Sequence, residues 1–262
     1  MTPQFTHDEL RRIEEISQNA SRPERGVMLD GWSVGLSPSK AKRSRCVNAF
    51  YPSVRPFETN LRETLALYQH VDLPCIFRLT PFVNDQTLDD RLAARGAPSF
   101  DRTAVQAMKL LPTFCLGNRN KNISIDVDIK TSTSPDAIGS IVQGLRGDTN
   151  DEITALVSRW KALPLALTSF TAVDRNSGAR LAHVLTIRDG DVIGVFDVIT
   201  SAAHRGRGLA SRVLECALAN AQVNGAQIAY LQVVESNPAK RVYERLGFRT
   251  VYHYWYRQLS DE

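Results

Sequence analysis

A short basic turn rich in glycine stands between a predicted strand and a predicted helix in the second half of this chain. The stretch HRGRG runs from His204 to Gly208, and two apolar stripes at helical spacing follow it as far as Gly225. A helix that begins after such a loop leaves its first N–H groups unpaired and carries partial positive charge there. The turn therefore suits a phosphate group, with Arg205 and Arg207 as further donors. The alternative is that the glycines only let the chain turn and the arginines are solvated.

The elements around this turn predict a mixed architecture. Upstream, three strands over residues 165–173, 179–187 and 192–200 are joined by the tight-turn sequences DRNSG and RDGD, which indicates an antiparallel meander. Downstream, AQIAYLQVV predicts a strand, and a short helix is predicted with Asn237 as N-cap and Gly247 just past its end. FRTVYHYWYR predicts a closing strand. This order is typical of the α+β class with a mixed α/β sheet.

The first half of the chain has elements of its own, and a polar stretch separates it from the second half. Strands are predicted within 32–52, in PCIFRLTP and in TAVQAMKLL, and a helix is predicted over 59–70. The stretch GNRNKN at 117–122 contains nothing that could join a core. We therefore predict two domains, 1–117 and 118–262.

Bulk properties exclude several classes of protein. Of the 262 residues, 43% are hydrophobic and 23% are charged, and the net charge of +4 does not demand a nucleic-acid partner. No apolar run reaches the roughly 20 residues of a membrane span, and we expect the first residues to form a polar tail that enters a helix, not a signal peptide. The cysteines are widely spaced and the histidines show no ligand spacing, so we expect no metal, no membrane and a reduced, cytoplasmic setting.

Two kinds of phosphate-binding turn can be compared with this one. GRGLAS approaches the GxGxxG dinucleotide fingerprint, but Ser211 replaces the third glycine and an antiparallel meander precedes it. RGRGLA matches the motif Q/R-x-x-G-x-G/A of the GNAT superfamily of acyl-CoA-dependent N-acyltransferases, with Arg205, Gly208 and Ala210 at its fixed positions. NPAKRVYERLGF resembles the second signature of that superfamily, one helix and one strand further on. On the two motifs together, the chain is identified as a member.

The resemblance covers roughly residues 123–257 and implies the GNAT acyl-CoA N-acyltransferase fold there. It further implies that acetyl-CoA binds where two parallel strands diverge. The backbone of 198–200 would pair with the pantetheine arm, the amides of 205–210 would take the pyrophosphate, and one N–H near Val198 would polarise the thioester carbonyl. The implied cofactor-binding residues are Val198, Ile199, Thr200, Arg205, Gly206, Arg207, Gly208, Leu209, Ala210 and Asn237.

The resemblance also implies a role for Tyr243. It stands where the family's usual general acid stands and would give a proton to the leaving thiolate. Tyr243 also shares a helix face with Ala239 and Leu246, so a purely structural role in the core is the alternative.

The base that would deprotonate an ammonium substrate is left open. Asp197, Glu235 and a chain of water molecules are the candidates, with His183 and His253 as weaker ones. Because neighbours in a strand alternate faces, we expect Asp197 to face away from Phe196 and Val198.

The implied activity is transfer of an acetyl group from acetyl-CoA to a primary amine by direct attack, the acceptor being a small molecule or a peptide. The alternative is a catalytically silent acyl-CoA-binding or regulatory protein. Residues 1–117 resemble the degenerate GNAT-like domain of tandem members and have no cofactor motif. Their one basic cluster, KAKRSR at 40–45, lies between predicted strands, which favours a solvated hairpin turn over an anion site.

Overall fold

The computed structural model describes residues 5–110 and 126–259, which form two compact units. Unit 1 comprises residues up to 20, 106–233 and 237–251, and unit 2 comprises 21–105, 234–236 and the residues from 252 on. Each unit thus takes chain from both halves of the sequence, because the first helix joins unit 1 and the end of the last strand joins unit 2. The predicted boundary at 117/118 lies outside the described residues, and the assignment of 1–117 and 118–262 as domains stays a prediction.

Unit 1 contains the predicted meander, with the strand order β5-β10-β9-β8-β7-β6. Its strands are β6 (Val127–Ser132), β7 (Ala166–Asp174), β8 (Arg180–Asp189), β9 (Val192–Thr200) and β10 (Ile228–Val234), together with the end of β5 (Ser99–Lys109). Its helices are α1 (His7–Ala20), α4 (Pro135–Arg146), α5 (Asn150–Ala162), α6 (Leu209–Val223) and α7 (Lys240–Leu246), with the 3-10 turn η2 (Ala202–His204). Strands β6 to β9 pair antiparallel, and β9 pairs parallel with β10. The predicted mixed sheet is confirmed.

Helix α4 is absent from the sequence-based prediction, although its signals are present. The Ser134 side chain accepts a hydrogen bond from the Ala137 amide, and Pro135 occupies the first helical position. The helix ends at Gly147, which has a φ of 78°. A capping box between Thr149 and Glu152 then begins α5. Two helices are therefore joined by a corner of only a few residues.

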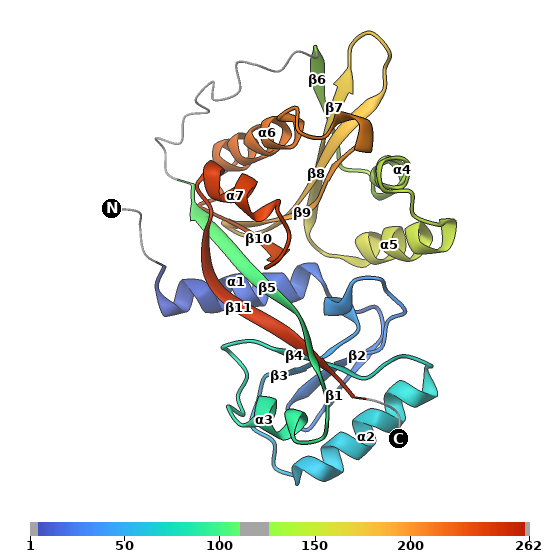
Figure 1. The fold of residues 1–262 in the computed structure, drawn as a ribbon, viewed down its shortest axis with the longest axis vertical. Coiled ribbons are helices and arrows are strands. Elements are labelled where there is room, and N and C mark those ends of the chain that lie inside the picture. Colours follow the sequence, from blue (N-terminus) through green and yellow to red (C-terminus); the bar gives the residue numbers. More distant parts are fainter. Residues whose placement is uncertain (1–4, 111–125, 260–262) are drawn as a thin grey trace. The chain divides into compact units, whose positions relative to one another are not determined.

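The helices of unit 1 cover both faces of its sheet. In Figure 1, α6 and α7 lie on one side of β8 and β9, and α4 and α5 lie on the other. On the α4/α5 side, Leu185 and Ile187 of β8 pack against Ile138, Val142 and Trp160. On the other side, α6 buries the apolar stripes expected of it, and Gly225 follows the helix with a φ of 88°, as predicted.

Unit 2 has the strand order β1-β2-β3-β4-β11. Its elements are β1 (Gly26–Leu29), β2 (Trp32–Gly35), η1 (Lys42–Ser44), β3 (Val47–Ala49), α2 (Phe57–His70), β4 (Ile76–Leu79) and α3 (Leu88–Ala93), with most of β5 and of β11 (Arg249–Gln258). Strand β1, which was not predicted, is exposed along most of its length. The remaining elements predicted in this region are present.

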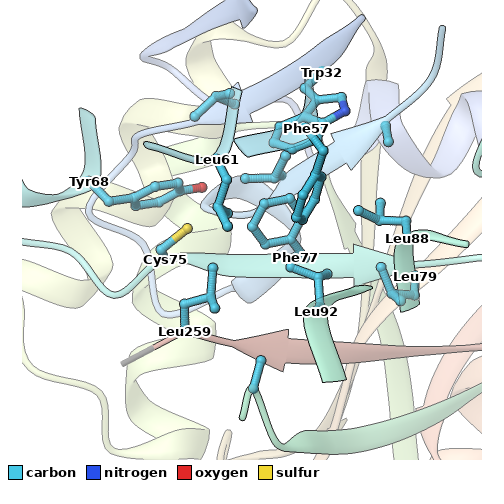
Figure 2. Packing of buried hydrophobic residues seen from close by; sticks show 14 of the residues in the cluster. Trp32, Phe57, Leu61, Tyr68, Cys75, Phe77, Leu79, Leu88, Leu92 and Leu259 are labelled. Atoms are coloured by element: carbon cyan, nitrogen blue, oxygen red, sulfur yellow. The ribbon is translucent and has the colours of Figure 1, made fainter. Parts of the chain in front are cut away.

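An aromatic cluster forms the core of unit 2 (Figure 2). The Trp32 ring packs edge-on against Phe77 and Phe57, with centroid distances of 5.2 and 6.0 Å. The buried Tyr68 hydroxyl donates a hydrogen bond to the Gly35 carbonyl oxygen at 2.9 Å. Leu259, which follows the last strand, belongs to the same cluster.

The segment 40–45 is not the solvated hairpin turn that the sequence predicts. Lys42 forms an ion pair with Asp101 at 2.8 Å. Arg43 donates to the Ser21 hydroxyl at 3.2 Å and to the Tyr254 hydroxyl at 3.4 Å. Groups distant in sequence therefore engage two of its cations, and pattern alone could not reveal these partners.

Two observations bear on the excluded classes of protein. Over residues 5–110 and 126–259, no helix has the length and apolar character to cross a bilayer. The same residues contain no group of three His, Cys, Asp or Glu side chains that could hold a metal ion.

Candidate functional site

Strands β9 and β10 pair over only part of their length. The parallel register runs from Val192 opposite Ile228 to Val195 opposite Leu231, and both strands continue beyond the last pair. On its other side, β9 stays paired with β8 as far as Thr200. The end of β9 is therefore held by one neighbour, and its opposite edge offers backbone groups in the way an edge strand does. Val198, Ile199 and Thr200, the predicted pantetheine-binding residues, occupy this end.

A β-bulge interrupts β9 at the start of this open segment. Leu185 of β8 pairs with Phe196, whereas His183 pairs with Ile199, so β9 has one residue more than β8 between these pairs. Asp197 lies in the bulge with a φ of 44°, the left-handed region that aspartate tolerates better than most residues. Phe196 and Ile199 consequently pack against the same hydrophobic cluster. The predicted simple alternation of faces around Asp197 is wrong here because of this extra residue.

The turn after β9 leads directly into α6. Gly206 and Gly208 have φ values of 76° and 77°, and Gly208 is the N-cap of the helix. The hydrogen bond from the Arg212 amide to the Gly208 carbonyl, 3.1 Å long, belongs to the first helical turn. The amides of the residues between them have no acceptor within the helix and point toward its entrance. The structure thus places the amides of Leu209 and Ala210 at a helix entrance.

A cavity of about 500 Å³ lies at this helix entrance. Arg205 and Arg207 are both exposed in its wall, so positive charge surrounds the free amides. The residues lining it are Thr200, His204, Arg205, Gly206, Arg207, Gly208, Leu209, Ala210, Ser211, Glu215, Val242, Arg245 and Leu246. The predicted set Arg205 to Ala210 is therefore gathered around one cavity.

Six lining residues were not predicted as site residues from the sequence: His204, Ser211, Glu215, Val242, Arg245 and Leu246. Glu215 follows Ser211 by one helical turn, so helical periodicity alone could have found it. The three residues of α7 come to the cavity because α7 packs against α6. That is a tertiary contact, which the local sequence does not predict.

Tyr243 is buried in α7, with 8% of its surface exposed. Burial raises the pKa of its hydroxyl to about 12. Its ring stands edge-on to Phe248 at a centroid distance of 6.4 Å. Val242 and Leu246, on the same helix, line the cavity. This placement is compatible with both roles considered for Tyr243, the proton donor and the core aromatic.

Asn237 does not occupy the N-cap position that the sequence predicts. Helix α7 begins at Lys240, and Ala239 is its N-cap. The Asn237 side-chain oxygen accepts a hydrogen bond from the Ala239 amide at 2.9 Å, so it caps the turn that precedes the helix. Gly247 ends α7 with a φ of 110°, as predicted.

The candidate bases have partners of their own. Arg146 donates to the Asp197 carboxylate at 2.7 Å. Within unit 2, the His253 ring contacts the Glu235 carboxylate at 2.9 Å. His183 is completely buried, and desolvation lowers the pKa of its imidazole to about 4, so it is neutral at physiological pH. Its Nδ1 lies 3.2 Å from the Thr171 hydroxyl.

A meander, a parallel strand that diverges from it and a glycine turn at a helix entrance form the arrangement that the resemblance to the GNAT superfamily implies. Residues 150–248 match the family model described as the acetyltransferase (GNAT) family. This segment therefore belongs to that family, and the identification made on the two motifs is confirmed.

Relatives extend this likeness to nearly the whole chain. Over 252 residues the chain is 24% identical to the uncharacterized N-acetyltransferase YobR of Bacillus subtilis (strain 168), covering 95% of this chain and 98% of that protein. A GCN5-related N-acetyltransferase from Kribbella flavida superposes with a TM-score of 0.65 at 19% identity, covering 96% of this chain and 95% of its own. A tandem GNAT protein from the clavulanic acid biosynthesis pathway gives a TM-score of 0.57 at 15% identity, covering 82% and 75%. The predicted GNAT fold is confirmed.

Proposed function

We propose that this chain transfers the acetyl group of acetyl-CoA to a primary amine of a small molecule or peptide. The observation that carries the proposal is the cavity at the entrance of α6, which Thr200 at the end of β9 also lines. Free amides, two exposed arginines and an open strand edge meet the needs of a long ligand with a pyrophosphate in its middle.

The residues around the cavity fit the CoA part of the ligand. A Cβ built at Gly206 has no atom within 4 Å, so the backbone there is open to a ligand. The amides of 205–210 would hold the pyrophosphate, and Arg205 and Arg207 would add charge-assisted bonds. The open edge of Val198 to Thr200 would pair with the amide-containing pantetheine arm as a neighbouring strand would. Asn237, whose side chain is engaged by Ala239, is the peripheral member of the set.

When bound, acetyl-CoA supplies an acyl group activated as a thioester. The Val198 amide would donate to the thioester carbonyl oxygen, where negative charge develops as the amine attacks. Holding the amine and the thioester in one cleft would supply much of the rate.

Tyr243 would donate its proton to the departing sulfur. A pKa near 12 keeps the phenol protonated at physiological pH, as an acid must be. The same shift makes it a weak acid, so its proton would move only as negative charge builds up on the sulfur. We propose that water takes the proton of the ammonium group, because Arg146 already engages Asp197. Cys46, Cys75 and Cys216 carry reduced thiols, which fits the cytoplasmic setting that we include in the proposal.

The direct test is release of CoA thiol from acetyl-CoA by the full-length protein over a panel of amines that includes peptides, polyamines and aminoglycosides. Calorimetry with acetyl-CoA runs in parallel. Amine-dependent thiol release supports the proposal. Tight binding without release for any amine would favour the silent acyl-CoA-binding protein, and absence of binding would reject both.

Tyr243→Phe separates the two roles of this side chain, because it keeps the ring and removes the proton. For an acid role we expect kcat to fall by roughly 10²–10⁴ with acetyl-CoA affinity unchanged. If wild-type kcat persisted although chemistry limits the rate, Tyr243 would be a packing residue.

A further inference from the structure

We propose that Arg146 is a positioning residue for acetyl transfer, which acts through Asp197 to hold the β9 bulge and so orients the amide of Val198. This inference rests on the proposed function and adds to it a residue outside both sequence motifs. Arg146 is the last residue of α4 and lies 51 positions before Asp197.

The bulge makes the direction of the Val198 amide depend on Asp197. The Val198 N–H belongs to the peptide group that directly follows the Asp197 α-carbon, so the backbone angles of Asp197 aim it. Asp197 has a φ of 44°, which most residues with a side chain avoid. The bulged residue also stands outside the regular β8–β9 register, so the ladder alone does not fix it. A contact made by the Asp197 side chain is therefore in a position to set this geometry.

Arg146 makes that contact, and its position is fixed by a second ion pair. Its guanidinium donates to Asp197 at 2.7 Å and also pairs with Asp148, whose side chain is only 2% exposed. Gly147 turns the chain between Arg146 and Asp148, and the Thr149 capping box begins α5 immediately afterward. One cation thus ties the α4–α5 corner to the bulge.

The electrostatics of Arg146, Asp148 and Asp197 favour the ion pair between Arg146 and Asp197. Burial opposes the charge of Arg146, but its bonds with Asp148 and Asp197 outweigh that effect and raise its pKa. The nearby His183 is neutral because desolvation lowers its pKa, so it does not compete with Arg146 for the carboxylates. Two carboxylates and one guanidinium in a half-buried setting form a pair network that solvent screens less than a surface pair.

The experiment uses the full-length chain and a ketone analogue of acetyl-CoA, in which a methylene replaces the sulfur and the carbonyl carries ¹³C. The infrared stretch of this carbonyl reports how strongly the bound carbonyl is polarised, and calorimetry reports affinity. The variants are Asp197→Asn, Asp197→Gly, Arg146→Met and Arg146→Lys. Arg175→Met is the matched control, because Arg175 pairs with Asp126 and Asp128 elsewhere in unit 1.

We expect the carbonyl stretch to move to higher frequency in Asp197→Asn, Asp197→Gly and Arg146→Met, with affinity for the analogue unchanged. With an amine that the panel identifies, kcat should fall by roughly 10- to 100-fold, as for a misplaced donor. Arg146→Lys should restore part of the shift, and Arg175→Met should leave it unchanged. Asp197→Asn keeps the Arg146–Asp148 pair, so it remains informative if Arg146→Met does not fold.

Failure of the inference is distinct from failure of the proposed function. If the wild type does not bind the analogue, the proposed function is wrong. If the wild type binds it and Asp197→Asn and Arg146→Met show the wild-type frequency, Arg146 has no positioning role.

Discussion

Two basic segments of this chain, residues 40–45 and 204–208, have similar charge and opposite surroundings. In the first, Lys42 and Arg43 are bound by Asp101, Ser21 and Tyr254, and the only helical structure is a 3-10 turn of 3 residues. In the second, Arg205 and Arg207 are exposed, and a helix of 15 residues begins directly behind them.

The difference indicates that a cluster of cations is suited to binding an anion only when its charges and the nearby amides remain available. To bind an anion, the first segment would have to give up contacts that hold unit 2 together, and a buried group left without its partner costs about 1–3 kcal/mol. In the second segment, the two arginines are exposed and line the cavity. The predictions below test this contrast, from the largest expected effect to the smallest.

Gly208→Asp should weaken acetyl-CoA binding by about 100-fold or more. The new carboxylate would lie among the amides of α6 and would meet the pyrophosphate as a like charge, which costs several kcal/mol. Aspartate tolerates a positive φ better than most residues, and a carboxylate at the start of a helix interacts favourably with the helix dipole, so α6 should persist. Calorimetry measures the affinity, and circular dichroism checks the fold.

Gly96→Asp is the matched control for this variant. Gly96 also has a positive φ, 75°, with no atom within 4 Å of a built Cβ, and it lies in unit 2. Affinity should be unchanged there. An equal loss in both variants, or none in Gly208→Asp, would place the CoA site elsewhere.

The helix entrance behind residues 204–208 could be predicted from the sequence, whereas the contacts of residues 40–45 could not. Glycines at 206 and 208, an amphipathic run and a preceding strand are local signals, so the helix entrance follows from the sequence. The partners of Arg43 come from residues 21 and 254, which lie far away in the chain. No local pattern reports such contacts, and the solvated turn expected there was wrong for that reason.

His183 is a buried basic group, and its burial makes the stability of the protein depend on pH. Its pKa is lowered from 6.5 to about 4 by burial, so between these values the unfolded chain binds a proton that the folded chain does not. The stabilisation is present above pH 6.5 and is lost as the pH falls toward 4. Lowering the pH from 7 to 5 should therefore reduce the free energy of unfolding by about 2 kcal/mol through protonation of His183 in the unfolded chain.

Urea unfolding of the wild type and of His183→Gln at these two pH values measures this contribution. The variant should lose correspondingly less stability than the wild type. Equal losses in the two proteins would show that protonation of His183 is not coupled to unfolding.

Arg207→Ala should weaken acetyl-CoA binding by about tenfold, as expected for one charge-assisted bond at an exposed site. The loss should shrink at high salt, because an exposed charge is screened. Lys42→Ala, in the segment 40–45, should leave the affinity for acetyl-CoA unchanged. Equal effects of the two substitutions would contradict the distinction between engaged and available cations.

The candidate site shows the same limit of prediction as the basic segments. The turn residues 205–210 were predicted and line one cavity, whereas Arg245 and Val242 reach it through the packing of α7 on α6. The bulge at Asp197 also escaped prediction, because an extra residue in a strand changes its register without changing its composition. Tertiary packing and register were decisive where sequence pattern failed.

The smallest expected effect is the absence of a second CoA site. If the two predicted domains share an ancestral fold, two molecules might be expected per chain, but the engaged cations of 40–45 leave no helix entrance in that segment to hold a phosphate. Titration of acetyl-CoA into the full-length protein should therefore saturate at one per chain.

A fragment ending at 117 is unsuitable for this test, because β4 pairs with β11 and the core of unit 2 includes Leu259. The informative variant is Gly208→Asp in the full chain, where any second site would remain intact. Two acetyl-CoA molecules per wild-type chain, with one still bound at wild-type affinity in that variant, would reveal a second site, and the division of labour drawn from the two segments would fail.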